Sequence, residues 1–305
     1  MEIVSKVGGP DPATVYTGRL EGGELVEFVE SVQPPVPRDE KWVLIVSTLV
    51  GCPVNCPMCD AGRFYARPLS AGEILEQVDR LVTRRYPDRK VPVPKFKIQF
   101  ARMGDPAFNP AVPEVLRRLP SIYDAPGLMP CISTIAPRGS GAFLEELLSI
   151  KNEFYSGGNF QMQFSIHSTS SRDRRRLIPC GLLGFDRLAE WGDRFHREGD
   201  RKIALNFAPV KGFSIEPKVI SRYFSPRHFM VKLTPVNPTF SALENALEGV
   251  IDPDRPGSGE NLALAFENEG FQVVLSIGDT RENAIGSNCG MYVETRRRAE
   301  AGTET

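Results

Sequence analysis

The sequence lacks any hydrophobic run long enough to cross a membrane, and it lacks an excess of positive charge. Its longest apolar stretch, Trp42 to Gly51, includes Ser47 and Thr48 and is far shorter than the roughly 20 residues that a bilayer requires. The opening Met-Glu-Ile-Val-Ser-Lys has no signal-peptide pattern. The formal net charge of -1 gives no support for a large nucleic-acid partner. We therefore expect a protein that acts away from the membrane.

Cysteine is also scarce, with six in 305 residues, and this is too few for a disulfide framework in a chain of this size. Thiols that stay reduced indicate the cytoplasm. The hydrophobic fraction of 41% is enough to bury the core of one barrel-sized domain.

Three of these cysteines, Cys52, Cys56 and Cys59, form a C-x3-C-x2-C motif directly after the longest apolar stretch. Three thiolates can hold three irons of a [4Fe–4S] cluster and leave the fourth iron open for a small molecule. S-adenosylmethionine (SAM) is the usual one for this spacing. A zinc site is the alternative, but zinc usually takes four ligands from paired motifs, and the sequence has no second pair.

Apolar strand-like runs alternate with helical patterns along the chain. The runs span residues 42–48, 96–101, 129–134, 160–166, 202–208 and 228–234, with a last strand candidate at 272–277. The clearest helix is Ser70–Arg85, where Ser70 and Glu73 form a capping box. Other helices are expected near 140–150, 185–198, 241–250 and 259–269. This alternation predicts a parallel α/β sheet, and periodicity fits a barrel and an open sheet equally well.

The two ends differ from this pattern. Residues 14–18 and 24–32 predict a β-hairpin that turns at Gly22-Gly23, and a charged end follows from Glu294. We expect an N-terminal extension with the hairpin over 1–38, a main α/β domain over 39–293 that includes a C-terminal cysteine loop, and a flexible tail over 294–305.

Small polar residues follow the predicted strands one after another. They are Gly104 and Asp105, Ser133, Ser165 and His167, Asn206, and Asn237. Parallel strands deliver such residues to one edge of the sheet, where active sites form. Taken singly, His167 could be a structural histidine and Asn237 a turn residue.

The remaining cysteines differ in their surroundings. Cys131 lies within an apolar strand and is expected to pack in the core, and Cys180 is expected to be a loop or packing residue. Cys289 lies in Gly-Ser-Asn-Cys-Gly-Met-Tyr, a polar loop after the last strand. A thiol on such a loop is a candidate nucleophile.

Several segments, taken in their order along the chain, resemble the RlmN/Cfr group of radical SAM methyl synthases, which modify an adenine in large-subunit ribosomal RNA. They are Ser47–Cys52, Met103–Pro106, Ser133-Thr134, Ser165–His167, Leu233–Pro238 and Asn288–Gly290. The resemblance implies a partial (β/α)6 radical SAM barrel over 39–293, with a short N-terminal β-hairpin extension.

The resemblance also implies roles for single residues. Cys52, Cys56 and Cys59 would bind the [4Fe–4S] cluster, and Cys289 would accept a methyl group from one SAM before its transfer to an sp2 carbon. Glu27 resembles a proton-accepting glutamate, and Glu30 is a weaker candidate on the opposite strand face. An external donor of flavodoxin or ferredoxin type would supply electrons. The expected SAM contacts are Gly104, Asp105, Ser133, Ser165, His167 and Asn237.

Three departures separate this chain from the group. Ile45 occupies the position of a second catalytic cysteine, so product release would differ, use Cys131 or Cys180, or not occur. The RNA-binding segment that precedes the barrel in the ribosomal enzymes has no counterpart in this sequence, and the net charge is near zero. We therefore expect a small heteroaromatic or nucleotide-like substrate rather than ribosomal RNA.

Some signals leave other possibilities open. Arg172, Arg174, Arg175 and Arg176 could hold phosphates or could form a solvated helix start. Two other functions also fit the sequence. One is a radical SAM enzyme that acts directly on its substrate without methylation, and the other is a non-catalytic iron–sulfur electron carrier or sensor.

Overall fold

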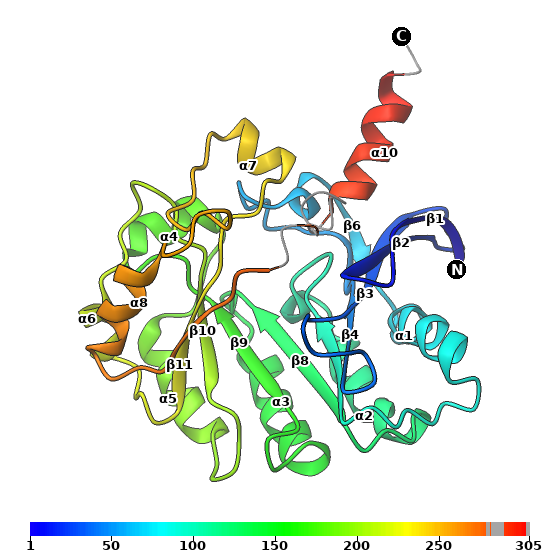
Figure 1. Ribbon diagram of the computed structural model, residues 1–305, viewed down its shortest axis with the longest axis horizontal. Helices are drawn as coiled ribbons and strands as arrows, with labels where there is room; N and C mark the ends of the chain where they lie inside the picture. The colour runs from blue at the N-terminus through cyan, green and yellow to red at the C-terminus, as the bar shows by residue number, and fades with distance from the viewer. Residues whose placement is uncertain (279–280, 282–289, 303–305) are drawn as a thin grey trace.

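A ten-stranded sheet forms the centre of the protein (Figure 1). The computed structural model describes residues 1–278, 281 and 290–302. The strand order is β1-β2-β3-β4-β7-β8-β9-β10-β11-β12, and every pair from β4 onward is parallel. These parallel strands are β4 (Lys41–Val46), β7 (Lys95–Phe100), β8 (Leu128–Thr134), β9 (Gln161–Ser165), β10 (Ile203–Phe207), β11 (Phe229–Leu233) and β12 (Val273–Leu275). The predicted parallel α/β architecture is confirmed, and β12 corresponds to the last strand candidate, predicted at 272–277.

Alternate residues of the parallel strands face opposite sides of the sheet. On the outer face, Trp42, Phe96 and Phe164 are fully buried in the main core, and the helices pack on this side (Figure 1). The opposite face, called the inner face below, carries polar residues at the intervening positions. The sheet is therefore apolar toward the helices and polar on its inner face.

The helices follow the strands in alternation. They are α1 (Ala71–Arg85), α2 (Val112–Ile122), α3 (Gly141–Phe154), α4 (Ser171–Leu177), α5 (Phe185–Phe195), α6 (Pro217–Ser221), α7 (Phe240–Glu244), α8 (Glu260–Glu267) and α10 (Met291–Gly302), with 3-10 turns η1 (Asp60–Arg63) and η2 (Pro106–Phe108). The predicted capping box of α1 is present: Glu73 N–H donates to Ser70 Oγ at 3.2 Å, and Ser70 N–H donates to Glu73 Oε2 at 2.8 Å. No helix within the described ranges is both long and apolar enough to span a bilayer.

The predicted N-terminal hairpin is present, but it is part of the main sheet. Strand β2 (Ala13–Arg19) pairs antiparallel with β3 (Leu25–Ser31), and β3 pairs antiparallel with β4. A strand that was not expected, β1 (Glu2–Gly8), pairs with β2 at the edge. The N-terminal residues therefore extend the barrel sheet instead of forming a separate unit.

The C-terminal residues also belong to regular structure that was not predicted. Residues 294–302, expected to belong to a flexible tail, lie in helix α10. Glu294 is 7% exposed, and Arg298 Nη2 contacts Glu244 of α7 at 2.6 Å. The charged composition predicted a frayed end. The ion pairs that hold this helix involve residues far away in the sequence, so composition does not reveal them.

A buried carboxylate at the start of α10 links the helix to the sheet. Glu27 on β3 is fully buried, and its Oε2 lies 2.6 Å from Nη2 of Arg102, which follows β7. Its two oxygens also accept backbone hydrogen bonds from Gly290, at 3.1 Å, and Val293, at 2.9 Å. Since a carboxylate is favourable at a helix N-terminus, this contact anchors α10.

Replacing Glu27 with alanine should therefore destabilise the protein strongly. The substitution removes the carboxylate that lies 2.6 Å from the buried Arg102 guanidinium, and loss of one member of a buried ion pair costs about 3–5 kcal/mol. Urea unfolding would measure the loss, and limited proteolysis should show earlier cleavage within α10. The control is Glu24→Ala, which removes the partly exposed pair with Arg67 and should cost about 1 kcal/mol or less. Equal losses in the two variants would contradict an anchoring role for Glu27.

Candidate active site at the carboxyl edge of the sheet

The three motif cysteines lie in a loop between two short strands, β5 (Leu49–Gly51) and β6 (Tyr65–Pro68), which pair antiparallel. Gly51 has a φ of +80°, and a Cβ there would lie 2.0 Å from the Phe64 carbonyl oxygen. Only glycine tolerates both conditions. The loop is closed by a hydrogen bond from Cys52 N–H to the same carbonyl, at 2.9 Å.

The three thiols are partly buried and close enough to influence each other electrostatically. Burial raises the pKa of Cys52 to about 12, and the charge of Cys59 adds to the increase, while backbone N–H groups of Val54 and Asp105 oppose it. Burial likewise raises the pKa of Cys56, followed by the charges of Cys59 and Cys52. Such thiols favour the thiolate only when a cation compensates the charge, as a metal centre does.

The donor set suits an iron–sulfur cluster better than a single ion. Three thiols with soft sulfur donors are typical ligands of iron–sulfur centres. Within the described part of the chain, no three His, Cys, Asp or Glu side chains converge on one ion. A cluster does not require such convergence, because each thiolate binds its own iron. The residues therefore fit a [4Fe–4S] group.

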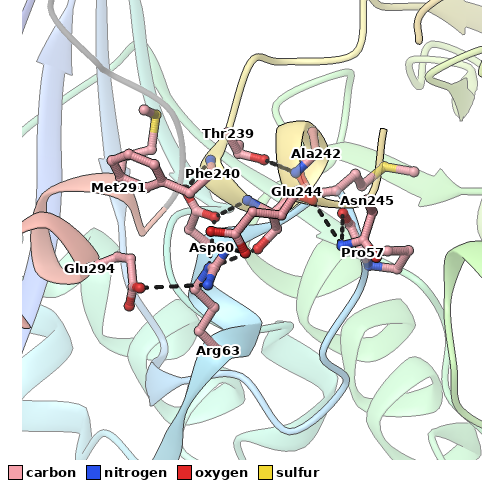
Figure 2. Close-up of polar contacts among 12 residues, drawn as sticks. Pro57, Asp60, Arg63, Thr239, Phe240, Ala242, Glu244, Asn245, Met291 and Glu294 are labelled. Atoms are coloured by element: carbon pink, nitrogen blue, oxygen red, sulfur yellow. Dashed lines mark hydrogen bonds and ion pairs between the residues drawn. The ribbon is translucent and has the colours of Figure 1, made fainter. Parts of the chain in front are cut away.

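Residues just after Cys59 fasten this loop to α7, as Figure 2 shows. Asp60 is fully buried and accepts hydrogen bonds from the backbone N–H groups of Phe240, at 3.0 Å, and Ser241, at 2.8 Å. Thr239 Oγ1 also donates to the Met58 carbonyl at 3.0 Å. The first turn of α7 is thus held by the residues that border Cys59.

Arg63 extends the connection to the C-terminal helix (Figure 2). Its guanidinium lies 2.5 Å from Glu244 of α7 and 3.6 Å from Glu294 of α10. Neither Arg63 nor Asp60 was predicted as a site residue. No local motif could have found them, since their partners are far away in the sequence.

Gly104 and Asp105 connect the cysteine loop with the ends of β7 and β8. Gly104 has a φ of +87°, and a Cβ there would lie 2.3 Å from the Leu49 side chain. The Asp105 carboxylate accepts hydrogen bonds from Thr134 Oγ1 and from the N–H groups of Ile135 and Ala107, at 2.7–2.9 Å. Burial raises the pKa of Asp105 to about 6, although these bonds lower it.

Two other predicted SAM contacts lie where the strands end on the inner face. Ser133 Oγ accepts a hydrogen bond from Gln163 Nε2 at 3.2 Å, and Ser165 stands opposite Asn206 in the register of β9 and β10. Asn206 is 8% exposed, and its Oδ1 has no hydrogen-bond partner among the described residues. A buried acceptor of this kind is usually satisfied by an ordered water or a bound group.

His167 has a fixed protonation pattern. Its Nδ1 accepts a hydrogen bond from the Ala208 N–H at 3.1 Å, so the ring proton is on Nε2. Burial, followed by the charge of Arg174, lowers the pKa of His167 to about 4, and the ring is neutral at pH 7. His167 is therefore a hydrogen-bond donor through Nε2. The last predicted contact, Asn237, is exposed in the loop after β11.

Cys289, the predicted methyl carrier, lies outside the described residues. Its sequence neighbour Gly290 has a φ of +85°, and a Cβ there would lie 2.3 Å from the backbone nitrogen of Ala61 in η1. Ala61 is two positions after Cys59. The segment that follows Cys289 therefore packs directly on the cysteine loop, and Glu27 holds it there.

The other cysteines lie at different levels of the barrel. Cys180 is half-buried and packs in a small hydrophobic cluster with Cys52 and Cys56. Cys131 is 5% exposed on the inner face of β8. Ile45, at the position of the second family cysteine, packs with Val29. Of the two remaining thiols, Cys180 is the one beside the proposed cluster.

The four clustered arginines separate in the structure. Arg174 is 6% exposed and stacks over the Phe185 ring at 4.6 Å, whereas Arg172, Arg175 and Arg176 are exposed on α4. Because one arginine is buried and three are exposed, the group is neither a uniformly solvated helix start nor a single phosphate-binding cluster.

Comparisons with known proteins agree with the fold and the motif order. No family model matches the chain. A probable dual-specificity RNA methyltransferase RlmN from Thermus thermophilus is 26% identical, over 94% of this chain and 76% of that protein. The dual-specificity RNA methyltransferase RlmN of Wolinella succinogenes is 24% identical, over 88% and 74%.

Solved structures show the same fold. A radical SAM methyltransferase from Sphaerobacter thermophilus superposes with a TM-score of 0.71 at 19% identity, covering 95% of this chain and 80% of that one. Streptococcus suis SuiB bound to S-adenosylmethionine gives a TM-score of 0.52 at 13% identity, covering 77% and 49%.

The expectation of a small-molecule substrate in preference to RNA is wrong, because these relatives are RNA methyltransferases. Net charge was a poor guide since it averages over the whole surface, whereas phosphate contacts depend on local cations such as the exposed arginines of α4. The order of the motifs, the parallel sheet and these relatives all agree with the radical SAM methyltransferases of the RlmN/Cfr-like group, a family that uses a [4Fe–4S] cluster and SAM.

Proposed function

We propose that this chain methylates an sp2 carbon of an adenine in RNA, with Cys289 carrying the methyl group before transfer. The names of the relatives support RNA as the substrate. The packing of Gly290 against Ala61 is the observation that carries the methyl-carrier role. It brings the residue next to Cys289 close to the cysteines that would hold the cluster.

Some residues would hold the cofactors, and others would position the reacting groups. Cys52, Cys56 and Cys59 would hold the cluster. When bound, the cluster and SAM supply a carbon radical that can abstract hydrogen from a methyl group. The proposed SAM contacts at the edge of the sheet are Gly104, Asp105, Ser133, Ser165, His167 and Asn237.

The main contribution of the chain to the proposed reaction is to position the reacting groups. Asp60 and Arg63 hold the cysteine loop against α7 and α10, and Glu27 holds the start of α10. Fixing the methyl-bearing sulfur relative to SAM and to the substrate lowers the entropic part of the barrier. Glu27 is also the proposed proton acceptor, and its carboxylate accepts a hydrogen bond from the N–H of Gly290, the residue that follows Cys289 in the sequence.

Product release requires the bond between the Cys289 sulfur and the product carbon to break. The resemblance implies that a second thiol forms a disulfide with Cys289 in this step, and Ile45 cannot do so. Cys180 is the candidate replacement, because it packs beside Cys52 and Cys56 at the proposed reaction centre.

Protein purified without oxygen from a SAM-replete host should carry one methyl group on Cys289, detectable by mass spectrometry of the peptide. Cys289→Ala should abolish transfer of a labelled methyl group to unmodified large-subunit ribosomal RNA, whereas Cys131→Ala should not. Equal turnover in Cys289→Ala would refute the carrier role. An unmodified Cys289 together with release of 5′-deoxyadenosine would favour direct radical chemistry. RNA that stays unlabelled by the wild-type enzyme would argue against the proposed substrate.

Cys180→Ser should slow product release, because serine cannot form the disulfide. We expect a covalent adduct between protein and RNA to accumulate, visible as a slower band on a denaturing gel. Cys131→Ser is the matched control and should release product at the wild-type rate. Wild-type turnover in Cys180→Ser, without adduct, would show that release does not use this thiol.

A further inference from the structure

The inner face of the sheet carries an unusual group of cations that the proposed reaction does not use. Lys41 of β4 lies beside Lys95 of β7 in the parallel register, and Lys97 lies two residues further along β7 on the same face. Lys232 of β11 stands opposite Asn206 of β10. We call Lys41, Lys95, Lys97, Lys232 and Arg201, which precedes β10, the inner cation group.

The group converges around Cys131 on β8. The charges of Lys97, Arg201, Lys232 and Lys95 all act on the Cys131 thiol. Lys97 is 8% exposed, and its Nζ donates to Gln161 Oε1 at 2.9 Å. The four lysines therefore lie on the inner face of the sheet, and Arg201, which is exposed, lies close enough to act on the same thiol.

No carboxylate among the described residues balances this charge. Within residues 1–278, 281 and 290–302, no ion pair joins a member of the inner cation group to an Asp or Glu side chain. Strand β4 and the parallel strands place no acidic residue on the inner face. Glu27 on the neighbouring β3 is already paired with Arg102.

In another part of the chain, a buried lysine does have an acidic partner. Lys151 of α3 is 1% exposed, forms an ion pair with Asp200 and donates to the Phe195 carbonyl at 2.7 Å. On the inner face, by contrast, burial followed by repulsion from Lys97 and Lys95 lowers the pKa of Lys41 to about 8. Burial and neighbouring cations also lower the pKa values of Lys95 and Lys232. Clustered cations without a counter-charge cost stability, and a bound anion offsets that cost.

We propose that the inner face binds a phosphate-class anion between Lys97 and Lys232, with Lys41, Lys95 and Arg201 around it. Several separate ammonium groups suit a tetrahedral anion with more than one negative charge better than a single carboxylate. Asn206 stands opposite Lys232 in the register of β10 and β11, and its amide Nδ2–H can donate a hydrogen bond to such an anion. The anion is either free phosphate or pyrophosphate, or a backbone phosphate of the RNA.

Calorimetric titration of the cluster-loaded protein with pyrophosphate, without SAM or turnover, tests the site. We expect saturable binding that weakens at least about tenfold in Lys97→Met/Lys232→Met, since each charge-assisted contact contributes about 1.5 kcal/mol or more. The control, Lys90→Met/Lys218→Met, removes two exposed lysines outside the group and should bind as the wild type does. No saturable binding, or equal affinity in both double variants, would overturn the site.

Lysine labelling of the wild-type protein gives a result that does not depend on a variant. Pyrophosphate should protect Lys41 and Lys95 from an amine-reactive reagent and leave Lys90 and Lys218 unchanged, and equal labelling would contradict the proposal. If unmodified RNA displaces pyrophosphate, the natural anion is a backbone phosphate, and if it does not, the anion is a free one. Because neither measurement requires methylation, failure of the proposed function and failure of this site are distinguishable.

Discussion

The buried contact between Glu27 and Arg102 is the constraint on which the arrangement of the site depends. It joins the antiparallel extension, the loop after β7 and the start of α10, and these come from three separate parts of the chain. A buried carboxylate needs such partners, because an unpaired charge away from water is costly. The same contact places Gly290 on η1, so the stability of the fold and the position of the segment after Cys289 have one physical cause.

The two faces of the sheet serve different purposes. The outer face supplies the core through large apolar side chains such as Trp42 and Phe96. The inner face and the carboxyl edge carry the chemistry, with thiols on the cysteine loop, small polar groups at the strand ends and cations toward the middle. This separation follows from the alternation of side chains along each strand. The apolar core can therefore stabilise the fold while the polar residues of the inner face remain available for the site.

Several elements were predictable because their signals are local. The capping box of α1 and the six apolar runs depend on residues a few positions apart, and the structure confirms them. Helix α2 was missed since Pro113 and Pro120 interrupt its pattern. Helix α4 was left open as a possible solvated helix start, since its seven residues, four of them arginine, present no apolar stripe. Helix α10 was taken for a frayed tail because Arg298 and Glu244 form a pair that no local pattern reveals.

The sequence by itself determined the parallel α/β class, the cysteine spacing and the order of polar residues along the strand ends, because each is a short-range pattern. Only the tertiary structure decided that Asp60 caps α7, that Gly290 rests on η1 and that five cations lie near Cys131. These contacts join residues from distant parts of the chain. Their geometry arises when the sheet curves and the two ends of the chain meet across it, and no local pattern contains that information.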